Sequence, residues 1–225
     1  MTKHTRRPYL WASERVARQM GFEAVAGIDE VGLGPLAGPV VAGAVVLPMG
    51  CRLPGIADSK KLSHVQRVKL DRMIRRRATA VGIGQATSHE LDRVGMTRAR
   101  QVAMERAIVA LGIPVEYLLI DAFDIPGSRL PQLAVVRGDA VCISIMAASI
   151  VAKVHRDLQM IEYDLEFPGY GFALHKGYAT AHHREAIRHL GPSPIHRISW
   201  QRVRQLAAIA ASGMPHGAVD DAGEC

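Results

Sequence analysis

The sequence is poor in cysteine, and it contains no long apolar segment. Its three cysteines are far apart, and none forms a CxxC pair or a Cys/His pair with metal-ligand spacing. The pattern offers no zinc-finger spacing, and a reducing cytoplasm is the compartment that it favours. The longest apolar run, residues 40–49, is too short to cross a bilayer, so we expect no membrane partner.

Aromatic residues are also scarce, at 5% of the chain, while apolar residues make up 48%. A core must therefore be filled by Val, Leu, Ile, Ala and Met, and the 225 residues fit one domain of ordinary size. Lys and Arg outnumber Asp and Glu by 28 to 21, which gives a formal net charge of +7. This balance favours an acidic partner such as nucleic acid, although many basic enzymes bind none.

Apolar periodicity predicts a mixed α/β domain, in which helices pack on a central sheet. The predicted strands are residues 24–29, 40–47, 79–86, 115–120 and 133–136. The predicted helices are residues 9–20, 60–77, 97–112 and 141–163, with an ordered loop at 167–180. Further helices at 180–190 and 199–211 are expected to form a small C-terminal subdomain. We divide the chain into a lead-in of residues 1–22, a main domain of residues 23–211 and a disordered tail of residues 212–225.

The most informative stretch is residues 26–39, in which two carboxylates precede a glycine–proline loop. Asp29 and Glu30 stand where an apolar strand runs out, Asp121 ends another strand, and Asp139 follows a third after a glycine. Neighbouring strands lie about 4.8 Å apart, so these acids can converge. Carboxylate oxygens favour Mg²⁺ or Mn²⁺ over zinc, and two such ions can assist phosphodiester hydrolysis. The sequence therefore predicts a metal-dependent nuclease.

Alternation along the strand complicates this interpretation. Adjacent strand residues point to opposite faces, so Asp29 and Glu30 can both bind metal only if the strand bends or if Glu30 offers its carbonyl oxygen. The alternative is that each acid starts a turn or caps a helix. The glycines at 32, 34 and 38 also allow a dinucleotide loop, but Pro35 and Pro39 interrupt the helix that such a loop must open.

A second group of residues is a candidate for contacts with nucleic acid. Tyr178 lies among basic residues and can stack on a sugar or base, or it can pack beneath a loop. The run at 75–77 suits the C-terminal end of a helix and is also a candidate for phosphate contacts, as are three lysines: Lys60, Lys61 and Lys153. We interpret the histidines at 182, 183, 189 and 196 as surface residues, because no zinc-binding pattern accompanies them.

Taken together, a series of motifs resembles bacterial ribonuclease HII, the type 2 ribonuclease H family. The motifs follow the family's order between about residues 24 and 204. They are GIDEVGLGP at 27–35, DSKKLS at 58–63, VRGD at 136–139, AASIVAKVHRD at 147–157, FPGYGF at 167–172, HKGYAT at 175–180 and GPSPIHR at 191–197.

The resemblance implies an RNase H-like fold and a catalytic domain over residues 23–211. It implies endonucleolytic cleavage of the RNA strand of RNA–DNA hybrids, and incision on the 5′ side of a single ribonucleotide embedded in duplex DNA. The products would carry 3′-hydroxyl and 5′-phosphate ends. Ribonucleotide excision repair, Mn²⁺ or Mg²⁺ as cofactor, a cytoplasmic location and a monomer are the corresponding expectations.

The resemblance also assigns residues. The family's four acidic positions, which are catalytic and bind metal, fall on Asp29, Glu30, Asp121 and Asp139, and its junction-sensing tyrosine falls on Tyr178. The remaining substrate-binding candidates are Gly32, Leu33, Gly34, Lys60, Lys61, Ser149 and Lys153. The family's loop is usually Gly-Arg-Gly. A leucine at 33 spares the backbone contacts to the ribonucleotide 2′-hydroxyl but removes a cation.

Two rival functions stay open at the level of sequence. One is a catalytically silent protein that binds hybrids, which the presence of all four acids argues against. The other is a nuclease of the same superfold, such as a junction resolvase, which would share the acids but not the Tyr178 motif. Cleavage assays on a hybrid and on branched DNA separate them.

Overall fold

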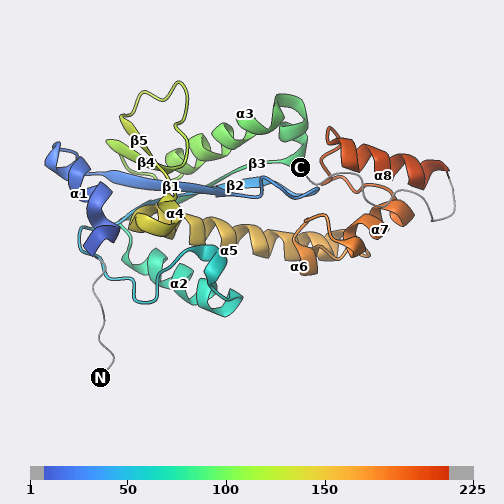
Figure 1. Cartoon of the computed structure of the whole chain (residues 1–225), viewed down its shortest axis with the longest axis horizontal. Coiled ribbons are helices and arrows are strands. Elements are labelled where there is room, and N and C mark those ends of the chain that lie inside the picture. Colours follow the sequence, from blue (N-terminus) through green and yellow to red (C-terminus); the bar gives the residue numbers. More distant parts are fainter. Residues whose placement is uncertain (1–7, 213–225) are drawn as a thin grey trace.

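A computed structural model describes residues 8–212 and shows a five-stranded sheet with helices on both faces (Figure 1). The strand order is β3-β2-β1-β4-β5. β1 pairs antiparallel with β2, and β2 with β3, whereas the β1–β4 and β4–β5 pairs are parallel. The strands are β1 (Val25–Val31), β2 (Val40–Val46), β3 (Ala80–Ala86), β4 (Tyr117–Asp121) and β5 (Gln132–Val135). The predicted mixed sheet is confirmed.

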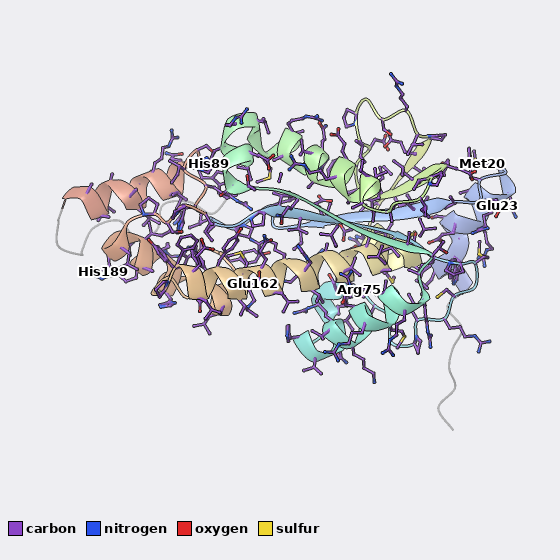
Figure 2. The ribbon with its side chains drawn as sticks, turned by 180° about the vertical axis from the view of Figure 1, so that it is seen from behind. Met20, Glu23, Arg75, His89, Glu162 and His189 are labelled. Carbon is purple, nitrogen blue, oxygen red and sulfur yellow. The ribbon has the colours of Figure 1, made fainter. Side chains whose placement is uncertain are left out.

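Helices form a layer on each side of this sheet. In Figure 1, α3 covers one face, α5 covers the other, and α2 packs on the outside of α5. Side chains fill the spaces between these layers (Figure 2). The helices are α1 (Ala12–Gln19), α2 (His64–Arg77), α3 (Ser88–Val109), α4 (Gly138–Val141), α5 (Ile143–Glu166), α6 (Phe172–His175), α7 (Ala181–Leu190) and α8 (Gln201–Ser212), with 3₁₀ turns η1 (Pro8–Trp11) and η2 (Ser59–Lys61).

Glycines in the strands allow the two helical layers to approach the sheet closely. A Cβ added to Gly43 of β2 would lie 2.4 Å from the carbonyl oxygen of Ala148 on α5. A Cβ on Gly84 of β3 would lie 2.2 Å from the carbonyl oxygen of Ala103 on α3. A larger residue at either position would push a helix away from the sheet. The close contacts therefore show which face of the sheet each helix covers.

The first half of α3 was missed by the sequence prediction. The predicted helix began at residue 97, but α3 begins at Ser88, where Thr87 and Glu90 form a capping box. Gly95 adopts φ +77° inside the element, which interrupts the helix and hides its periodicity. Other boundaries moved by a few residues, and Asp139 lies in α4 rather than at a strand end.

The C-terminal helices pack around α6 and the end of α5. Tyr170 and Phe172 stack with ring centroids 5.2 Å apart, and buried residues of α7 and α8 complete this cluster. Ser212, predicted as the first residue of the disordered tail, ends α8 instead, and the rest of that predicted tail, like residues 1–7, lies outside the described residues. Within residues 8–212 no helix is both long and apolar enough to cross a membrane.

Candidate active site

Two of the predicted acids are neighbours on parallel strands. Ile28 of β1 pairs with Ile120 of β4, so the next residues, Asp29 and Asp121, lie side by side at the same edge of the sheet. Asp29 pairs across β2 with Gly43, which places its side chain on the α5 face. Asp29 is buried, with 6% of its surface exposed. The sheet therefore brings these two carboxylates together without help from a loop.

Glu30 points to the other face of the sheet. β1 stays regular at this position, because Glu30 pairs with Ala42, which in turn pairs with Gly84 on the α3 side. The Glu30 carboxylate lies 3.7 Å from a guanidinium nitrogen of Arg100 on α3, and its Oε2 is buried without a hydrogen-bond partner. The strand does not bend here, so the carboxylates of Asp29 and Glu30 diverge.

Asp139 completes the α5 side of the site through a short turn. The Gly138 amide donates a 2.7 Å hydrogen bond to Oδ1 of Asp121, which brings α4 against the end of β4. Oδ2 of Asp139 accepts a 3.0 Å hydrogen bond from Nζ of Lys60. Among the described residues, no three Asp, Glu, His or Cys side chains are gathered closely enough to hold a metal ion as they stand.

Three of the four acids have raised pKa values, mainly because their carboxyl groups are buried. Burial raises the pKa of Asp29 well above its usual value, and the charges of Glu30 and Asp121 raise it further. Burial also raises the pKa of Glu30, although Arg100 opposes the change. The pKa of Asp121 is raised by burial and then by Asp139. The raised pKa values show that Arg100 and Lys60 do not fully compensate the negative charge of the site.

Of the other predicted substrate-binding side chains, some contact the acidic site and others do not. Ser149 is buried, its hydroxyl lowers the pKa of Asp29, and it lies 2.9 Å from the hydroxyl of Ser59 in η2. Lys61 is exposed. Lys153 instead forms a 2.6 Å bond to Asp157 in the next turn of α5. Ser149 thus contacts the acidic site, whereas Lys153 is engaged elsewhere.

The glycine loop, residues 32–39 between β1 and β2, is hydrogen-bonded to the segment that carries Tyr178. The Leu36 amide donates a 2.8 Å bond to the carbonyl of Gly177. A Cβ added to Gly34 would lie 3.9 Å from the Tyr178 ring, which is 44% exposed. Leu33 is half-buried and packs against the core cluster on the α3 side. The loop and the tyrosine therefore form one surface.

Four buried polar residues behind this surface were missed by sequence reasoning. Arg156 and Arg197 are fully buried and donate to backbone carbonyls of the loop. His183 and His196 are also buried, with their Nε2 atoms 3.0 Å apart, which corrects the prediction that they are surface residues. One signal was available, because His183 falls on the same helical face as the apolar Ala186 and Ile187.

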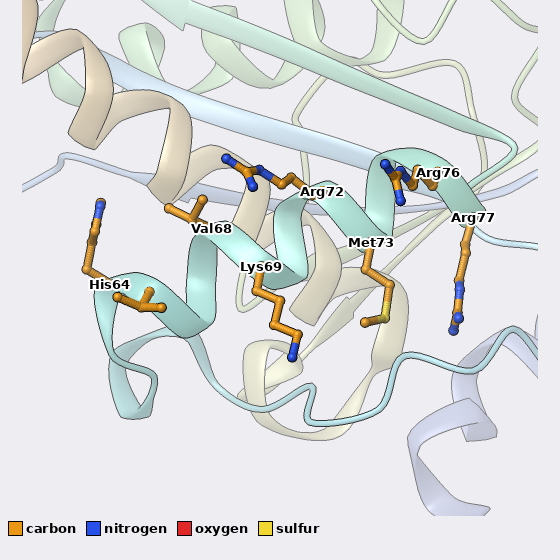
Figure 3. Close-up of a pocket in the computed structure, with 8 residues that line it drawn as sticks. His64, Val68, Lys69, Arg72, Met73, Arg76 and Arg77 are labelled. Carbon is orange, nitrogen blue, oxygen red and sulfur yellow. The ribbon is translucent and has the colours of Figure 1, made fainter.

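A separate hollow of about 720 Å³ lies along α2, and every residue that lines it belongs to this helix (Figure 3). Lys69 and Arg72 on this face are exposed, as are Arg76 and Arg77 near its end. The hollow contains none of the four acids and is not the site of the chemistry. The run Arg75–Arg77 does lie in the last turn of α2, where cations suit the helix dipole.

Comparison with known proteins agrees with this arrangement. A family model described as ribonuclease HII matches residues 26–203. The ribonuclease HII of Geobacter metallireducens is 51% identical over 199 residues, which cover 88% of this chain and 93% of that protein. The crystal structure of ribonuclease H2 from Pyrococcus horikoshii matches with a TM-score of 0.69 at 27% identity, and covers 83% of this chain and 98% of that one. Bst-RNase HIII in complex with Mn²⁺ has the same fold, with a TM-score of 0.69 at 21% identity over 87% of this chain and 73% of that one.

The match spans the glycine loop, the acids of β1 and β4, and the Tyr178 segment, which are the features that the sequence motifs predicted. Most of the chain is covered, and the fold agrees with the solved relatives. The chain therefore belongs to the ribonuclease HII family, and its activity is the endonucleolytic cleavage of the RNA strand of RNA–DNA hybrids.

Proposed function

We propose that Asp29, Asp121 and Asp139 hold a pair of divalent cations, Mg²⁺ or Mn²⁺, that this endonuclease requires. The observation that carries the proposal is the placement of Asp29 and Asp121 side by side on neighbouring strands, each with a raised pKa. Carboxylates that are buried together without compensating charge are costly to the fold, and a divalent cation removes that cost.

The donor set fits a hard cation. The three aspartates offer only oxygen ligands on the α5 face, and such ligands suit Mg²⁺ or Mn²⁺. A divalent cation at this position supplies positive charge that stabilises the transition state of phosphodiester hydrolysis. Glu30 is expected to contribute its main-chain carbonyl, because its carboxylate lies on the α3 face beside Arg100.

Lys60 lies at the edge of this site and pairs with Asp139. Its side chain is 79% exposed, yet its ammonium group bonds to Asp139. The pKa of Lys60 is raised, mainly by this hydrogen bond. If Asp139 bound a cation, the ammonium group of Lys60 would be available to contact a phosphate of the substrate. Lys61, which is exposed beside it, can contact the same backbone.

The glycine loop and Tyr178 recognise the ribonucleotide in this proposal. Gly34 is exposed and lies beside the Tyr178 ring, so the backbone of residues 32–34 can meet a 2′-hydroxyl while the ring stacks on an adjacent sugar or base. Cleavage then occurs on the 5′ side of a single ribonucleotide in duplex DNA, and leaves 3′-hydroxyl and 5′-phosphate ends.

The test uses an end-labelled DNA duplex that carries one ribonucleotide, with the product ends mapped. We expect no cleavage in a chelator, recovery with Mg²⁺ or Mn²⁺, and loss of most activity in Asp121→Asn. Asp124→Asn is the matched control, because Asp124 is an exposed acid three residues away that should leave the activity unchanged. Binding without cleavage under all conditions would favour a silent hybrid-binding protein, and full activity in chelator would contradict the metal assignment.

A further inference from the structure

Two arginines lie fully buried beneath the glycine loop, and neither has a carboxylate partner. Within residues 8–212, no carboxylate oxygen lies within 4.0 Å of the guanidinium of Arg156 or Arg197. The acids whose charges reach them have other partners: Asp92, near Arg197, accepts from the amides of Ile198 and Ser199, and Asp157, near Arg156, is bonded to Lys153. A charge buried in this way loses its hydration, so an unusual set of other partners must stabilise it.

Those partners are backbone carbonyls of the loop. Arg197 donates to the carbonyl oxygens of Gly32 and Leu33, the latter at 3.0 Å, and to that of Gly38 at 3.0 Å. Arg156 donates to three other carbonyls, those of Ala37, Pro39 and Lys176, at 2.9–3.0 Å. The two guanidinium groups therefore turn one side of the loop's backbone inward.

The direction of these carbonyls fixes the direction of the amides that follow them in the chain. In a planar trans peptide the C=O of one residue and the N–H of the next point in opposite directions. Because the carbonyls of Gly32 and Leu33 point to Arg197, the amides of Leu33 and Gly34 point away from it. Neither amide donates to any acceptor in the described part of the chain. The loop thus presents two unused donors on the side of the exposed Gly34.

Both donors lie beside Tyr178 and close to the buried guanidinium of Arg197. A Cβ added to Gly34 would lie 3.9 Å from the Tyr178 ring. Burial and the neighbouring charge of Arg156 lower the pKa of Arg197 to about 9, so it remains a cation at neutral pH. Oriented amides above a buried cation form a site for an electron-rich oxygen.

We propose that Arg197 is the positioning residue for ribonucleotide recognition: it aims the amides of Leu33 and Gly34 at the 2′-hydroxyl oxygen of the substrate. The proposal rests on the proposed function, because it assumes that the loop meets the ribonucleotide. It adds a residue that does not touch the substrate but sets the direction of the groups that do.

The experiment measures binding in a chelator, so that cleavage does not interfere. The Kd is determined for two duplexes that differ in one 2′-hydroxyl, and their ratio is the discrimination. We expect Arg197→Lys to lower this ratio about fivefold, because one amide–hydroxyl hydrogen bond is worth about 1 kcal/mol. The matched control is Arg156→Lys, which changes an equally buried arginine that lies in α5 and donates to the same loop, but not to the carbonyls that precede the two amides. We expect it to leave the ratio within twofold.

The outcomes separate the two proposals. If the parent protein does not distinguish the duplexes, recognition by the loop is wrong and the proposed function fails at that step. If the parent distinguishes them and a folded Arg197→Lys variant does so equally well, only the role of Arg197 is overturned. An equal loss in both lysine variants would show general damage to the loop, and would also overturn a specific role for Arg197.

A second measurement on the parent protein covers the case in which Arg197→Lys does not fold. Amide hydrogen exchange at Leu33 and Gly34 should be fast in the free protein, because neither amide is bonded. It should slow on addition of the ribonucleotide duplex, and not on addition of the all-DNA duplex. Protection of both amides in the free protein, or no difference between the duplexes, contradicts the proposal.

Discussion

Asp29→Asn should inactivate the enzyme and at the same time stabilise its metal-free fold. Asp29 is buried, and burial together with Glu30 and Asp121 raises its pKa. An acid whose pKa is higher in the folded state lowers stability as the pH rises above its unfolded pKa, because the folded state then holds a proton that the unfolded state has lost. At pH 7 the folded protein must therefore pay for either a buried charge or a retained proton.

The size of the effect follows from the burial of this one group. A buried polar group without adequate compensation costs about 1–3 kcal/mol, and asparagine removes the charge while keeping the shape. In a domain of this size 1 kcal/mol corresponds to roughly 2–4 °C in Tm. We therefore expect Asp29→Asn to melt several degrees above the parent in a chelator at pH 7, and the gap to close as the pH falls below the raised pKa of Asp29.

Asp139→Asn is the control, because Asp139 is a proposed metal ligand that already has a charged partner, whereas Asp29 has none among the described residues. Asp139 bonds to Lys60, whose side chain is 79% exposed, and such a pair contributes about 0–1 kcal/mol. We expect this variant to be inactive but no more stable than the parent. Addition of Mg²⁺ or Mn²⁺ should raise the Tm of the parent and have less effect on either variant. If Asp29→Asn is destabilised in chelator, the electrostatic reasoning is wrong.

Three further predictions concern the surface formed by the loop and Tyr178, and the buried histidine pair behind it. Tyr178→Ala should lose about 1–3 kcal/mol of stacking in single-turnover cleavage of a duplex with one ribonucleotide, and Tyr178→Phe should lose less; equal rates would make Tyr178 a packing residue. Gly32→Ala should lower the Tm, because Gly32 has φ +93° and its Cβ would meet Arg156, whereas Gly34→Ala should keep the Tm but weaken binding of the ribonucleotide duplex. Burial lowers the pKa of His183 to about 4 and of His196 to about 3, so the unfolded state binds protons first as the pH falls. Urea unfolding should therefore show a loss of about 2 kcal/mol per histidine between pH 7 and pH 5, and an unchanged stability would contradict the neutral pair.

Much of the sheet could be predicted because its strands carry simple signals. β1 is apolar up to Ile28 and carries Asp29 and Glu30 near its end, β2 is a continuous apolar run, and Asp121 ends β4. Alternation along the strand predicts that the Glu30 side chain points away from that of Asp29. Both residues could then bind a metal only if the strand bent or if Glu30 offered its carbonyl oxygen. In the structure β1 pairs regularly at this position, since Glu30 pairs with Ala42, and a carbonyl ligand from Glu30 stays a prediction.

The support behind the glycine loop could not be predicted, because it depends on contacts between segments that are far apart in sequence. Arg197 reaches a carbonyl 165 residues earlier, and a pattern-based reading has no reason to bury an arginine. The tautomers of the histidine pair are equally a matter of three-dimensional contacts. The Tyr178 carbonyl can only accept, so Nδ1 of His183 carries a proton, and its Nε2 must accept from Nε2 of His196.

The same contacts change the meaning of Leu33, the position at which the chain departs from its family's usual arginine. An arginine there would place its charge on the surface, where salt screens it. Leu33 instead packs on the α3 side of the core, and its carbonyl is held by Arg197. The charge that remains near the loop is buried, so salt screens it far less than it would screen a surface cation. The residue type at position 33 therefore affects how strongly the surface attracts a polyanion. The orientation of the amides of Leu33 and Gly34 depends instead on Arg197, which is far away in the sequence.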